Sequence, residues 1–366
     1  MKTVVVLGAG KIGRMVSHFL VHSGDYRVRV GDVSQAAVAA ITSNLGAAEG
    51  RQVDFSSESD LDAILDGAYA VVSCAPFHCN PKIAERAKGK GVHYLDLTED
   101  VAVTQRIQEL AAGAKTAMIP QCGLAPGFIT ICAVHLMAGL REVRDLRLRV
   151  GALPRYPNNI FRYNLTWSTE GLINEYCRPC EVVSDGVLQN VPPLEGLESF
   201  VVDGVEYEAF NTSGGLSTLA ASLEGSVRNV DYKSIRYPGH NYLLKFLLSD
   251  LMLRDHTDEL RRIFERALPA TKQDQIVIFV TASGKDGDQL VQRTFARTIY
   301  HQMIDGQEWS GIQITTAAGV CAVLDLLREG KLPNSGFVRQ EDVQFADFIK
   351  NRFGRYYAVS GRGDGA

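Results

Sequence analysis

A glycine-rich turn close to the N-terminus constrains the fold of this chain more than any other feature. The run Thr3–Leu7 (TVVVL) is apolar and β-branched, which predicts a fully buried parallel strand. It leads directly into GAGKIG at 8–13, and the residues after Gly13 repeat apolar side chains at helical spacing. A strand, this G-x-G-x-x-G pattern and a helix, in that order, are typical of the phosphate-binding turn of a dinucleotide-binding fold.

The three glycines of this turn have separate physical roles. Gly8 permits the tight turn, Gly10 lets the backbone approach a pyrophosphate, and Gly13 allows the helix to pack closely on the strand. The free N–H groups at the start of the helix, from Lys11 and Ile12 onward, then face the phosphates. The alternative is a glycine-rich turn that binds no ligand.

A second strand, predicted over Tyr26–Gly31, ends at Asp32, about 20 residues after the glycine turn. An acid at that position can accept hydrogen bonds from both ribose hydroxyls of an adenosine. It also repels a 2′-phosphate, and the following Val33, Ser34 and Gln35 supply no arginine to bind one. We therefore expect NAD rather than NADP as the cofactor. Asp32 could instead cap the next helix, a role that Ser34 fills equally well.

Strand and helix patterns continue to alternate up to about residue 120. Four more strands are predicted at 50–54, 69–73, 92–96 and 115–120, separated by helices. Six strands alternating with helices indicate an α/β fold, the Rossmann doubly wound parallel sheet. Ligands bind such a sheet at the carboxyl ends of its strands. Besides the glycine turn and Asp32, the residues expected there against the cofactor are Val33, Asp54, Phe55, Cys74, Ala75 and Pro76.

The pattern changes after residue 125. Strand-like, turn-rich segments run to about residue 240, including FRYNLTWS at 161–168, and a long hairpin is predicted at 275–301. These segments predict a second α+β domain with a mixed, largely antiparallel sheet. Because the apolar helix predicted at 311–328 is of a kind that closes back onto a nucleotide-binding sheet, we assign 1–125 and 311–366 to the Rossmann domain and 126–310 to the second domain. The tail from Asn351 is expected to fray.

Composition and charge exclude several classes of protein. The 366 residues include 38 Lys and Arg against 42 Asp and Glu, and the net charge of −4 leaves no electrostatic footprint for nucleic acid. No apolar run approaches the roughly 18 residues of a membrane span, and the N-terminal run is too short for a signal peptide. Seven scattered cysteines favour a reducing cytoplasm. Cys177 and Cys180 have the spacing of a metal-binding pair, but no second pair accompanies them, so we expect no metal.

Several motifs beyond the glycine turn resemble the saccharopine dehydrogenase family, most closely its lysine 6-dehydrogenase and saccharopine-reductase-like members. The resemblance implies an N-terminal NAD(P) domain, a second domain for an amino acid substrate and for dimerisation, and hydride transfer at a carbon bearing nitrogen. Saccharopine reductases usually carry Asp where this chain has Ala125, so the resemblance favours the lysine 6-dehydrogenases. The matching motifs, in family order, are GAGKIG (8–13), CGLAPG (122–127), TEGLINEYCRP (169–179), TSGGLSTL (212–219) and SIRYPGH (234–240).

An amino acid substrate brings a carboxylate, for which a bidentate arginine is the natural partner. Arg236, in the SIRYPGH motif, is the first candidate, and Arg155 and Arg162 are next. A surface or interface salt bridge is the alternative for Arg236. The remaining residues expected against the substrate are Cys122, for which packing is the alternative, Gly123, and His240, for which a helix cap is the alternative.

Hydride removal from an amine carbon requires the neutral amine, so a base or a proton path to water must be near. The catalytic candidates are Asp96 and Glu99, at the predicted end of the fifth strand, and His93, near its start. His93 is equally well explained as a packed, hydrogen-bonded core histidine, and His240 is a further candidate for proton transfer.

Together these observations predict an NAD-dependent oxidoreductase acting on the C–N bond of an amino acid. The activity is expected to be most like that of L-lysine 6-dehydrogenase, which converts the ε-amine to a semialdehyde plus ammonia. The alternatives are a saccharopine-type imine reduction and a non-catalytic NAD-sensing or scaffold protein. The resemblance adds the expectation of a homodimer, while composition and charge predict a cytoplasmic protein that binds neither nucleic acid nor membrane.

Overall fold

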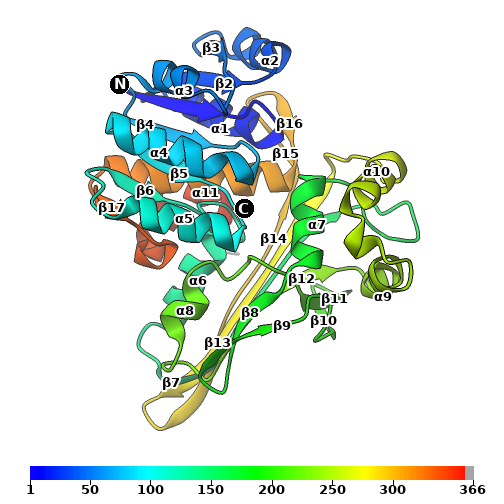
Figure 1. Ribbon diagram of the computed structural model, residues 1–366. Helices are drawn as coiled ribbons and strands as arrows, with labels where there is room; N and C mark the ends of the chain where they lie inside the picture. Colours follow the sequence, from blue (N-terminus) through cyan, green and yellow to red (C-terminus); the bar gives the residue numbers. More distant parts are fainter. Residues whose placement is uncertain (359–366) are drawn as a thin grey trace, which may run out of the picture. The chain divides into compact units, whose positions relative to one another are not determined.

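The computed structural model describes residues 1–358, and the chain divides into two compact units (Figure 1). The first unit combines Met1–Ile131 with the chain from Gln313 onward, and the second unit is Cys132–Ile312. The predicted boundaries, after residues 125 and 310, lie within a few residues of these. The first unit is therefore built from two separate parts of the sequence.

The first unit contains a parallel sheet of seven strands in the order β17-β6-β5-β4-β1-β2-β3. Strand β1 pairs with β2 on one side and with β4 on the other, so the strand order reverses between β1 and β4, where doubly wound sheets bind their ligands. The Rossmann fold is thus confirmed, and the strands are β1 (Lys2–Leu7), β2 (Tyr26–Asp32), β3 (Glu49–Gln52), β4 (Ala70–Ser73), β5 (His93–Asp96), β6 (Ala117–Ile119) and β17 (Gly336–Phe337).

Helices cover both faces of this sheet. In Figure 1, α3, α4 and α5 lie in front of the strands, and α11 lies behind them. The front layer packs on alternate strand residues such as Val5, Leu7 and Val71, as the period of two in a strand requires. The helices of the first unit are α1 (Lys11–His22), α2 (Gln35–Leu45), α3 (Glu58–Leu65), α4 (Asn80–Lys90), α5 (Val101–Ala111), α11 (Gly311–Arg328), α12 (Phe345–Lys350) and the short 3-10 turns η1 (Phe77–Cys79), η4 (Gln340–Asp342) and η5 (Gly354–Tyr357).

Polar caps set where several of these helices begin. Ser34, Ser57 and Asp100 precede α2, α3 and α5, and each side chain accepts a hydrogen bond from a backbone N–H in the first turn of its helix. Ser34, and not Asp32, therefore caps α2. This leaves Asp32 at the end of β2 for a different set of contacts.

Helix α11 belongs to the core of the first unit. By length and composition it is the one helix in residues 1–358 that could cross a membrane, contrary to the expectation that no segment could. However, 83% of this stretch is buried inside the protein, which is the environment of a core helix. Tyr357 is buried against this helix, and its hydroxyl donates to the carbonyl oxygen of Thr315. The expectation of a frayed tail is therefore wrong for 351–358. The remainder of the predicted tail, 359–366, lies outside the described residues.

The second unit is built on an eight-stranded mixed sheet, as predicted. Its main path is β10-β11-β12-β7-β13-β14, and the β8–β9 hairpin joins at β12. All pairings are antiparallel except that of β12 with β7. The long strands β7, β13 and β14 run side by side in Figure 1. The strands are β7 (Arg141–Pro154), β8 (Cys180–Ser184), β9 (Val187–Val191), β10 (Glu198–Val202), β11 (Val205–Asn211), β12 (Asn229–Arg236), β13 (Asp274–Asp286) and β14 (Gln289–Tyr300).

Helices and one irregular segment complete the second unit. The segment 161–168, predicted as strand-like, forms no strand and instead runs as a connection between β7 and α7. Its Tyr163 and Leu165 are nevertheless buried in a cluster with residues of α7, α9 and α10. The remaining elements are α6 (Phe128–Met137), α7 (Thr169–Cys177), α8 (Leu219–Leu223), α9 (His240–Lys245), η2 (Phe246–Asp250), η3 (Leu253–Asp255), α10 (Thr257–Ala267), β15 (Gln302–Ile304) and β16 (Gln307–Trp309).

Candidate functional site

The glycine turn after β1 has the geometry of a phosphate-binding loop. Gly8 has φ of +102°, and a Cβ there would lie 2.5 Å from the carbonyl oxygen of Cys74. A Cβ on Gly13 would lie 1.8 Å from the carbonyl oxygen of Gly8, whereas a Cβ on Gly10 would meet nothing within 4 Å. Gly8 and Gly13 are thus required by the protein itself. Gly10 faces open space, which is what close approach of a pyrophosphate needs. The turn therefore fits a dinucleotide.

Asp32 holds this turn against the loop that follows β2. The backbone N–H of Ala9 donates to Asp32 Oδ2 at 2.6 Å, and that of Ser34 donates to Oδ1 at 2.8 Å. Gln52 donates from Nε2 to the carbonyl oxygen of Val33, whose side chain is 54% exposed. A carboxylate oxygen can accept more than one hydrogen bond, so Asp32 retains acceptor capacity for ribose hydroxyls.

The other predicted cofactor residues divide into two groups. Asp54, Ala75 and Pro76 are partly or fully exposed after β3 and β4, and hydrogen bonds from Ser56 lower the pKa of Asp54. Phe55 is buried in the hydrophobic core, which accounts for its side chain by packing within the protein. Cys74 contributes its carbonyl group to the wall beside Gly8, and burial raises the pKa of its thiol to about 12.

Asp96 links the end of β5 to neighbouring segments by hydrogen bonds. Its side chain is fully buried and accepts hydrogen bonds from Tyr94 Oη and from the backbone N–H groups of Thr98 and Gln121. Burial raises its pKa to about 6, although these three donors favour the charged form. Its oxygens accept hydrogen bonds from β5, from Thr98 and from Gln121 after β6, so Asp96 fixes the geometry of these strand ends. This structural role argues against the predicted role of catalytic base.

His93 has a structural explanation as well. It lies at the start of β5, away from the ligand-binding edge, and its Nδ1 accepts a hydrogen bond from the backbone N–H of Ala117 at 2.9 Å. Its ring packs edge-on against Tyr69. The alternative of a packed core histidine therefore accounts for it. Glu99 differs, because it is half-buried in the connection between β5 and α5, at the carboxyl edge of the sheet.

Cys122 and Gly123 form a compact turn within the first unit. Cys122 is 1% exposed, its Sγ donates to the carbonyl oxygen of Ile119, and burial raises its pKa well above the ordinary value. A Cβ on Gly319 of α11 would lie 2.6 Å from the carbonyl oxygen of Gly123. Helix α11 thus packs directly on this turn. Packing, the alternative interpretation of Cys122, therefore accounts for its side chain. Gly123, also predicted to contact the substrate, contributes only backbone atoms to this turn.

In the second unit, Arg236 occupies a buried position at the end of β12. Only 3% of the residue is exposed, and its guanidinium lies 5.2 Å from the ring centre of Tyr163 and 5.5 Å from that of Tyr176. Nε donates to Tyr176 Oη at 2.8 Å, and one Nη donates to the carbonyl oxygen of Ile235. The charge of the buried Glu175 acts on this guanidinium. Two of its N–H groups are used in the hydrogen bonds above, so further donors remain for a ligand carboxylate.

His240 continues the hydrogen-bond chain that begins at Arg236. Its Nδ1 lies 2.9 Å from the carbonyl oxygen of Phe161, which can only accept, so Nδ1 carries the proton. Nε2 is then the acceptor for the hydroxyl of Tyr176, at 3.2 Å. Burial and the charge of Arg236 lower the pKa of His240 to about 3. His240 therefore stays neutral and orients Tyr176, which argues against a role in proton transfer near neutral pH.

Two hydroxyl groups of the segment 161–168 were not among the residues predicted from the sequence. Tyr163 is fully buried, and its hydroxyl lies near Thr166 and Trp167 of the same segment, but within the described residues neither it nor Thr166 Oγ1 has a partner in good hydrogen-bond geometry. Both lie in the segment mistaken for a strand. A buried polar group without a partner is costly, so a ligand that bonds it gains affinity. The sequence signal was the density of aromatic and polar residues in FRYNLTWS, which suits the lining of a site.

The other two candidate arginines do not join Arg236. Arg155 is exposed and stacks over the ring of Tyr300 at 4.8 Å. Arg162 is also exposed, with φ of +50°. Neither meets the requirement for a desolvated partner of a carboxylate, so Arg236 alone keeps that candidacy.

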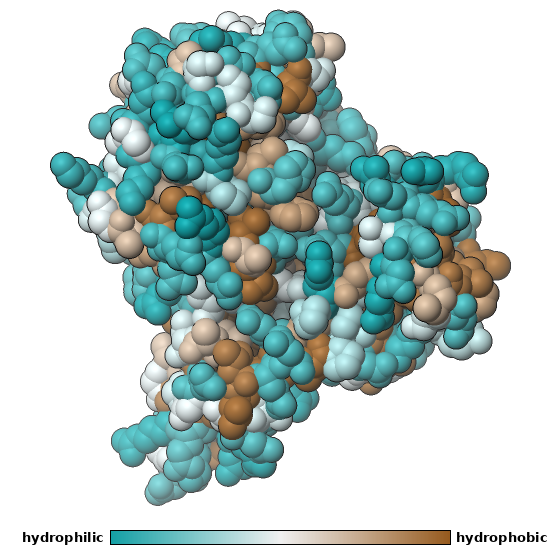
Figure 2. Space-filling view, in the orientation of Figure 1, coloured by the Kyte–Doolittle hydropathy of each residue, from teal (hydrophilic) through white to brown (hydrophobic). Residues whose placement is uncertain are grey.

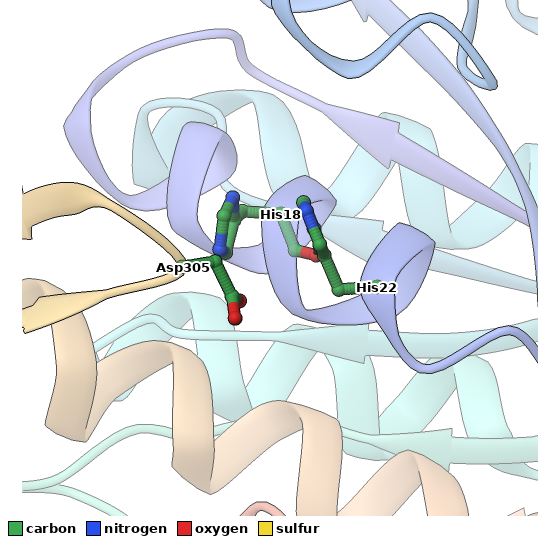
Figure 3. Close-up of side chains that lie close together, drawn as sticks. All are labelled: His18, His22 and Asp305. Atoms are coloured by element: carbon green, nitrogen blue, oxygen red, sulfur yellow. Dashed lines mark hydrogen bonds between the residues drawn. The ribbon is translucent and has the colours of Figure 1, made fainter.

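Two further groups contain side chains of the kinds that bind metals. His18 and His22 lie one turn apart on α1 (Figure 3), with ring centres 4.0 Å apart, and His22 Nδ1 donates to the carbonyl oxygen of His18. In the second unit, burial raises the pKa of both Cys177 and Cys180.

Comparison with known proteins identifies the family. The model described as the saccharopine dehydrogenase NADP binding domain matches residues 4–119, and that of the saccharopine dehydrogenase C-terminal domain matches 123–354. The chain belongs to the saccharopine dehydrogenase family. Members of this family are NAD(P)-dependent oxidoreductases that act on CH–NH groups, and the matched N-terminal model describes a nicotinamide dinucleotide domain.

Individual relatives are distant. The mitochondrial alpha-aminoadipic semialdehyde synthase of Rattus norvegicus is 21% identical over 280 residues, and that of Mus musculus is 20% identical over 196 residues. These alignments cover 71% and 52% of this chain but 29% and 21% of the relatives, so the chain spans less than a third of their length. The saccharopine dehydrogenase (L-Glu forming) of Saccharomyces cerevisiae has the same fold, with a TM-score of 0.80, 16% identity, and coverage of 97% of this chain and 98% of its own.

Proposed function

We propose that this protein is an NAD-dependent amino acid oxidoreductase that acts as an L-lysine 6-dehydrogenase. The observation that carries the proposal is Arg236, a buried arginine that bonds Tyr176 Oη, lies over the ring of Tyr163 and keeps further N–H donors. A substrate carboxylate would accept from these donors and from Tyr163 Oη at the same time. An amino acid is the class of substrate that brings such a carboxylate.

The proposed reaction removes a hydride from the ε-carbon of lysine. Water then hydrolyses the resulting imine, so that lysine, NAD and water give the semialdehyde, ammonia, NADH and a proton. The names of the rat and mouse relatives refer to alpha-aminoadipic semialdehyde, the same product. Oxidised nicotinamide, when bound, supplies the hydride acceptor. The backbone of residues 8–13 holds the pyrophosphate, and Asp32 bonds the ribose.

Proton handling in this proposal falls to few groups. The amine must be neutral before the hydride leaves, which alkaline pH favours. Asp96 and His93 are committed to backbone N–H groups, and His240 stays neutral. Glu99 is a candidate acid or base because of its position, half-buried at the carboxyl edge of the sheet. Water can serve in its place.

NAD is preferred over NADP in this proposal, although the matched domain is described as NADP binding. The reason is local. The carboxylate of Asp32 lies where a 2′-phosphate would sit, and it is followed by the apolar, exposed side chain of Val33 and by the helix cap Ser34.

Saccharopine-type imine reduction is the second candidate. The full-length fold match to the yeast saccharopine dehydrogenase favours it. Against it stands Ala125, which supplies no carboxylate at a motif position where saccharopine reductases usually carry Asp. A non-catalytic NAD-sensing or scaffold protein is the remaining alternative, and a buried arginine suited to a substrate carboxylate argues against it.

A substrate screen tests these proposals. The protein is incubated at alkaline pH with NAD or NADP and with L-lysine, L-ornithine, 1,5-diaminopentane or saccharopine, and absorbance of the reduced cofactor is recorded. We expect reduction with L-lysine and NAD, and much less with 1,5-diaminopentane, which lacks the carboxylate. Reduction with saccharopine alone would favour the second candidate. Dinucleotide binding without reduction by any compound would favour the non-catalytic alternative.

A further inference from the structure

Glu208 of β11 lies directly beside Arg236 of the neighbouring strand β12. Strands β11 and β12 are antiparallel, and their register pairs Glu208 with Arg236. Side chains of directly paired residues project from the same face with Cβ atoms about 4.5–5.5 Å apart. An acid in this position is the natural ion-pair partner of the arginine. Such a pair would leave Arg236 unavailable to a substrate carboxylate.

That ion pair does not form in the described residues, because Glu208 bonds to a neighbouring turn instead. Its Oε2 accepts the backbone N–H of Gly239 at 2.8 Å, and its Oε1 accepts that of Asn241 at 2.6 Å. The side chain is 6% exposed, so these charge-assisted hydrogen bonds lie in a poorly solvated environment. Both oxygens are thus bonded to fixed backbone donors rather than to Arg236.

The turn that Glu208 holds also carries His240. Gly239 and Asn241 flank this residue, and Asn241 Nδ2 is further fixed by the carbonyl oxygen of Leu194 at 2.8 Å. The His240 ring fixes the position of the Tyr176 hydroxyl, because Tyr176 Oη donates to His240 Nε2. Tyr176 Oη in turn accepts a hydrogen bond from Arg236 Nε. The hydrogen bonds of Glu208 are therefore transmitted through His240 and Tyr176 to the orientation of the guanidinium.

We propose that Glu208 is a positioning residue that keeps Arg236 oriented for a substrate carboxylate and free of an ion pair with Glu208 itself. The inference rests on the proposed function only in naming the ligand as an amino acid. Glu208 does two things in this account. It aligns the turn at 239–241, and it keeps its own charge bonded to backbone amides.

The test compares ligands that differ only in the carboxylate. L-Norleucine and 1-aminopentane share the same carbon chain and amine, and 1-aminopentane lacks the carboxylate. Their dissociation constants are measured by calorimetry on the NAD-loaded full-length protein and on Glu208→Gln. In the variant one of the two backbone N–H groups meets an amide N–H. We expect weaker binding of norleucine by about tenfold or more, and unchanged binding of 1-aminopentane.

Two further variants separate positioning from general stability. Asp274→Asn is a matched control, because Asp274 is another buried carboxylate that accepts two backbone N–H groups, those of Gly311 and Ile312. It is expected to lower the melting temperature without selective loss of norleucine. Glu208→Asp keeps the charge but is one methylene shorter, so its carboxylate is released toward Arg236, and norleucine binding is expected to weaken here too.

The outcomes are distinct. Wild-type norleucine affinity in both Glu208 variants would overturn the inference, as would equal weakening of both ligands or a selective loss in Asp274→Asn. If the wild type binds norleucine more tightly than 1-aminopentane but does not oxidise lysine, the proposed reaction fails and the role of Glu208 stands. If the wild type does not discriminate between the two ligands, both fail.

Discussion

The glycine turn offers a sharp separation between folding and cofactor binding. Gly13→Ala places a methyl group 1.8 Å from the carbonyl oxygen of Gly8 and 2.9 Å from its carbonyl carbon. Either α1 or the turn must retreat by more than an ångström, because ordinary contacts of a Cβ atom begin at 3.4 Å. Gly10→Ala adds the same methyl group where nothing lies within 4 Å, at φ of −73° and ψ of −164°, which alanine adopts without strain.

The magnitudes follow from these distances. Overpacking at Gly13 is expected to cost about 1–3 kcal/mol or more, and a unit of this size loses about 2–4 °C in melting temperature per kcal/mol. Gly10→Ala is expected to change the free energy of unfolding by less than about 1 kcal/mol, the scale of a helix N-cap change. Its methyl group occupies the approach of the pyrophosphate, so NADH binding is expected to weaken by about tenfold or more.

Thermal unfolding and calorimetric titration with NADH measure both quantities on each variant. We expect Gly13→Ala to melt well below the wild type. We expect Gly10→Ala to melt at nearly the wild-type temperature but to bind NADH poorly. If Gly10→Ala melted as low as Gly13→Ala, the open space beside Gly10 would be an incorrect account of the turn. If it bound NADH with wild-type affinity, the turn would not be the pyrophosphate site.

Three further predictions address single features of the molecule. Asp32→Ala is expected to weaken NAD binding relative to NADP by about tenfold or more, measured by titration with both cofactors, and an unchanged ratio would restrict Asp32 to its bonds with the backbone. Burial raises the pKa of Asp96 to about 6, from an ordinary value of 3.8, so the folded state binds its proton more tightly than the unfolded state. The free energy of unfolding is then expected to fall by about 3 kcal/mol as pH rises through the window between those values. Asp96→Asn, which can still meet Tyr94, Thr98 and Gln121, is expected to remove this slope in denaturant titrations and to keep activity, whereas loss of activity without unfolding would restore Asp96 as the base. Apolar residues gather at the right-hand edge of Figure 2, in the region of α9 and η2, where Tyr242 is 77% and Met252 57% exposed. We expect a dimer by light scattering that Tyr242→Glu combined with Met252→Glu converts to monomer, and a monomeric wild type would contradict this.

Local sequence patterns predicted the first unit well because its signals are local. The strand, glycines and helix of the turn are contiguous, and Asp32 follows within the same β–α–β unit, so no distant contact was needed to place them. The seventh strand was missed, since the two residues Gly336–Phe337 carry no period of their own and form a strand only by pairing with β6.

The roles of individual side chains were harder to predict, because their partners come from elsewhere in the sequence. Asp96 and His93 lie in the predicted strand, yet their roles are set by backbone N–H groups of Gln121 and Ala117, on or just after the neighbouring strand. Glu208 was not singled out at all. Its importance depends on the register of β11 against β12, which no local pattern encodes.

Arg236 was found by its motif and its chemistry, but the structure supplies what decides between the alternatives. A surface salt bridge and a buried substrate partner are indistinguishable in the sequence, whereas 3% exposure and the hydrogen bond to Tyr176 separate them. Tyr163 was assigned to a strand because aromatic residues favour strands, although here they line a buried cluster.

The central claim, oxidation at the ε-carbon of lysine, is tested most directly with lysine carrying heavy nitrogen in its ε-amine. The protein is incubated with this substrate and NAD at alkaline pH, and the ammonia released is analysed by mass spectrometry while NADH is measured by absorbance. The account predicts heavy ammonia in equal amount to NADH, and loss of both in Arg236→Gln at low lysine concentration. NADH formed without heavy ammonia, or no NADH from a protein that binds NAD, would contradict it.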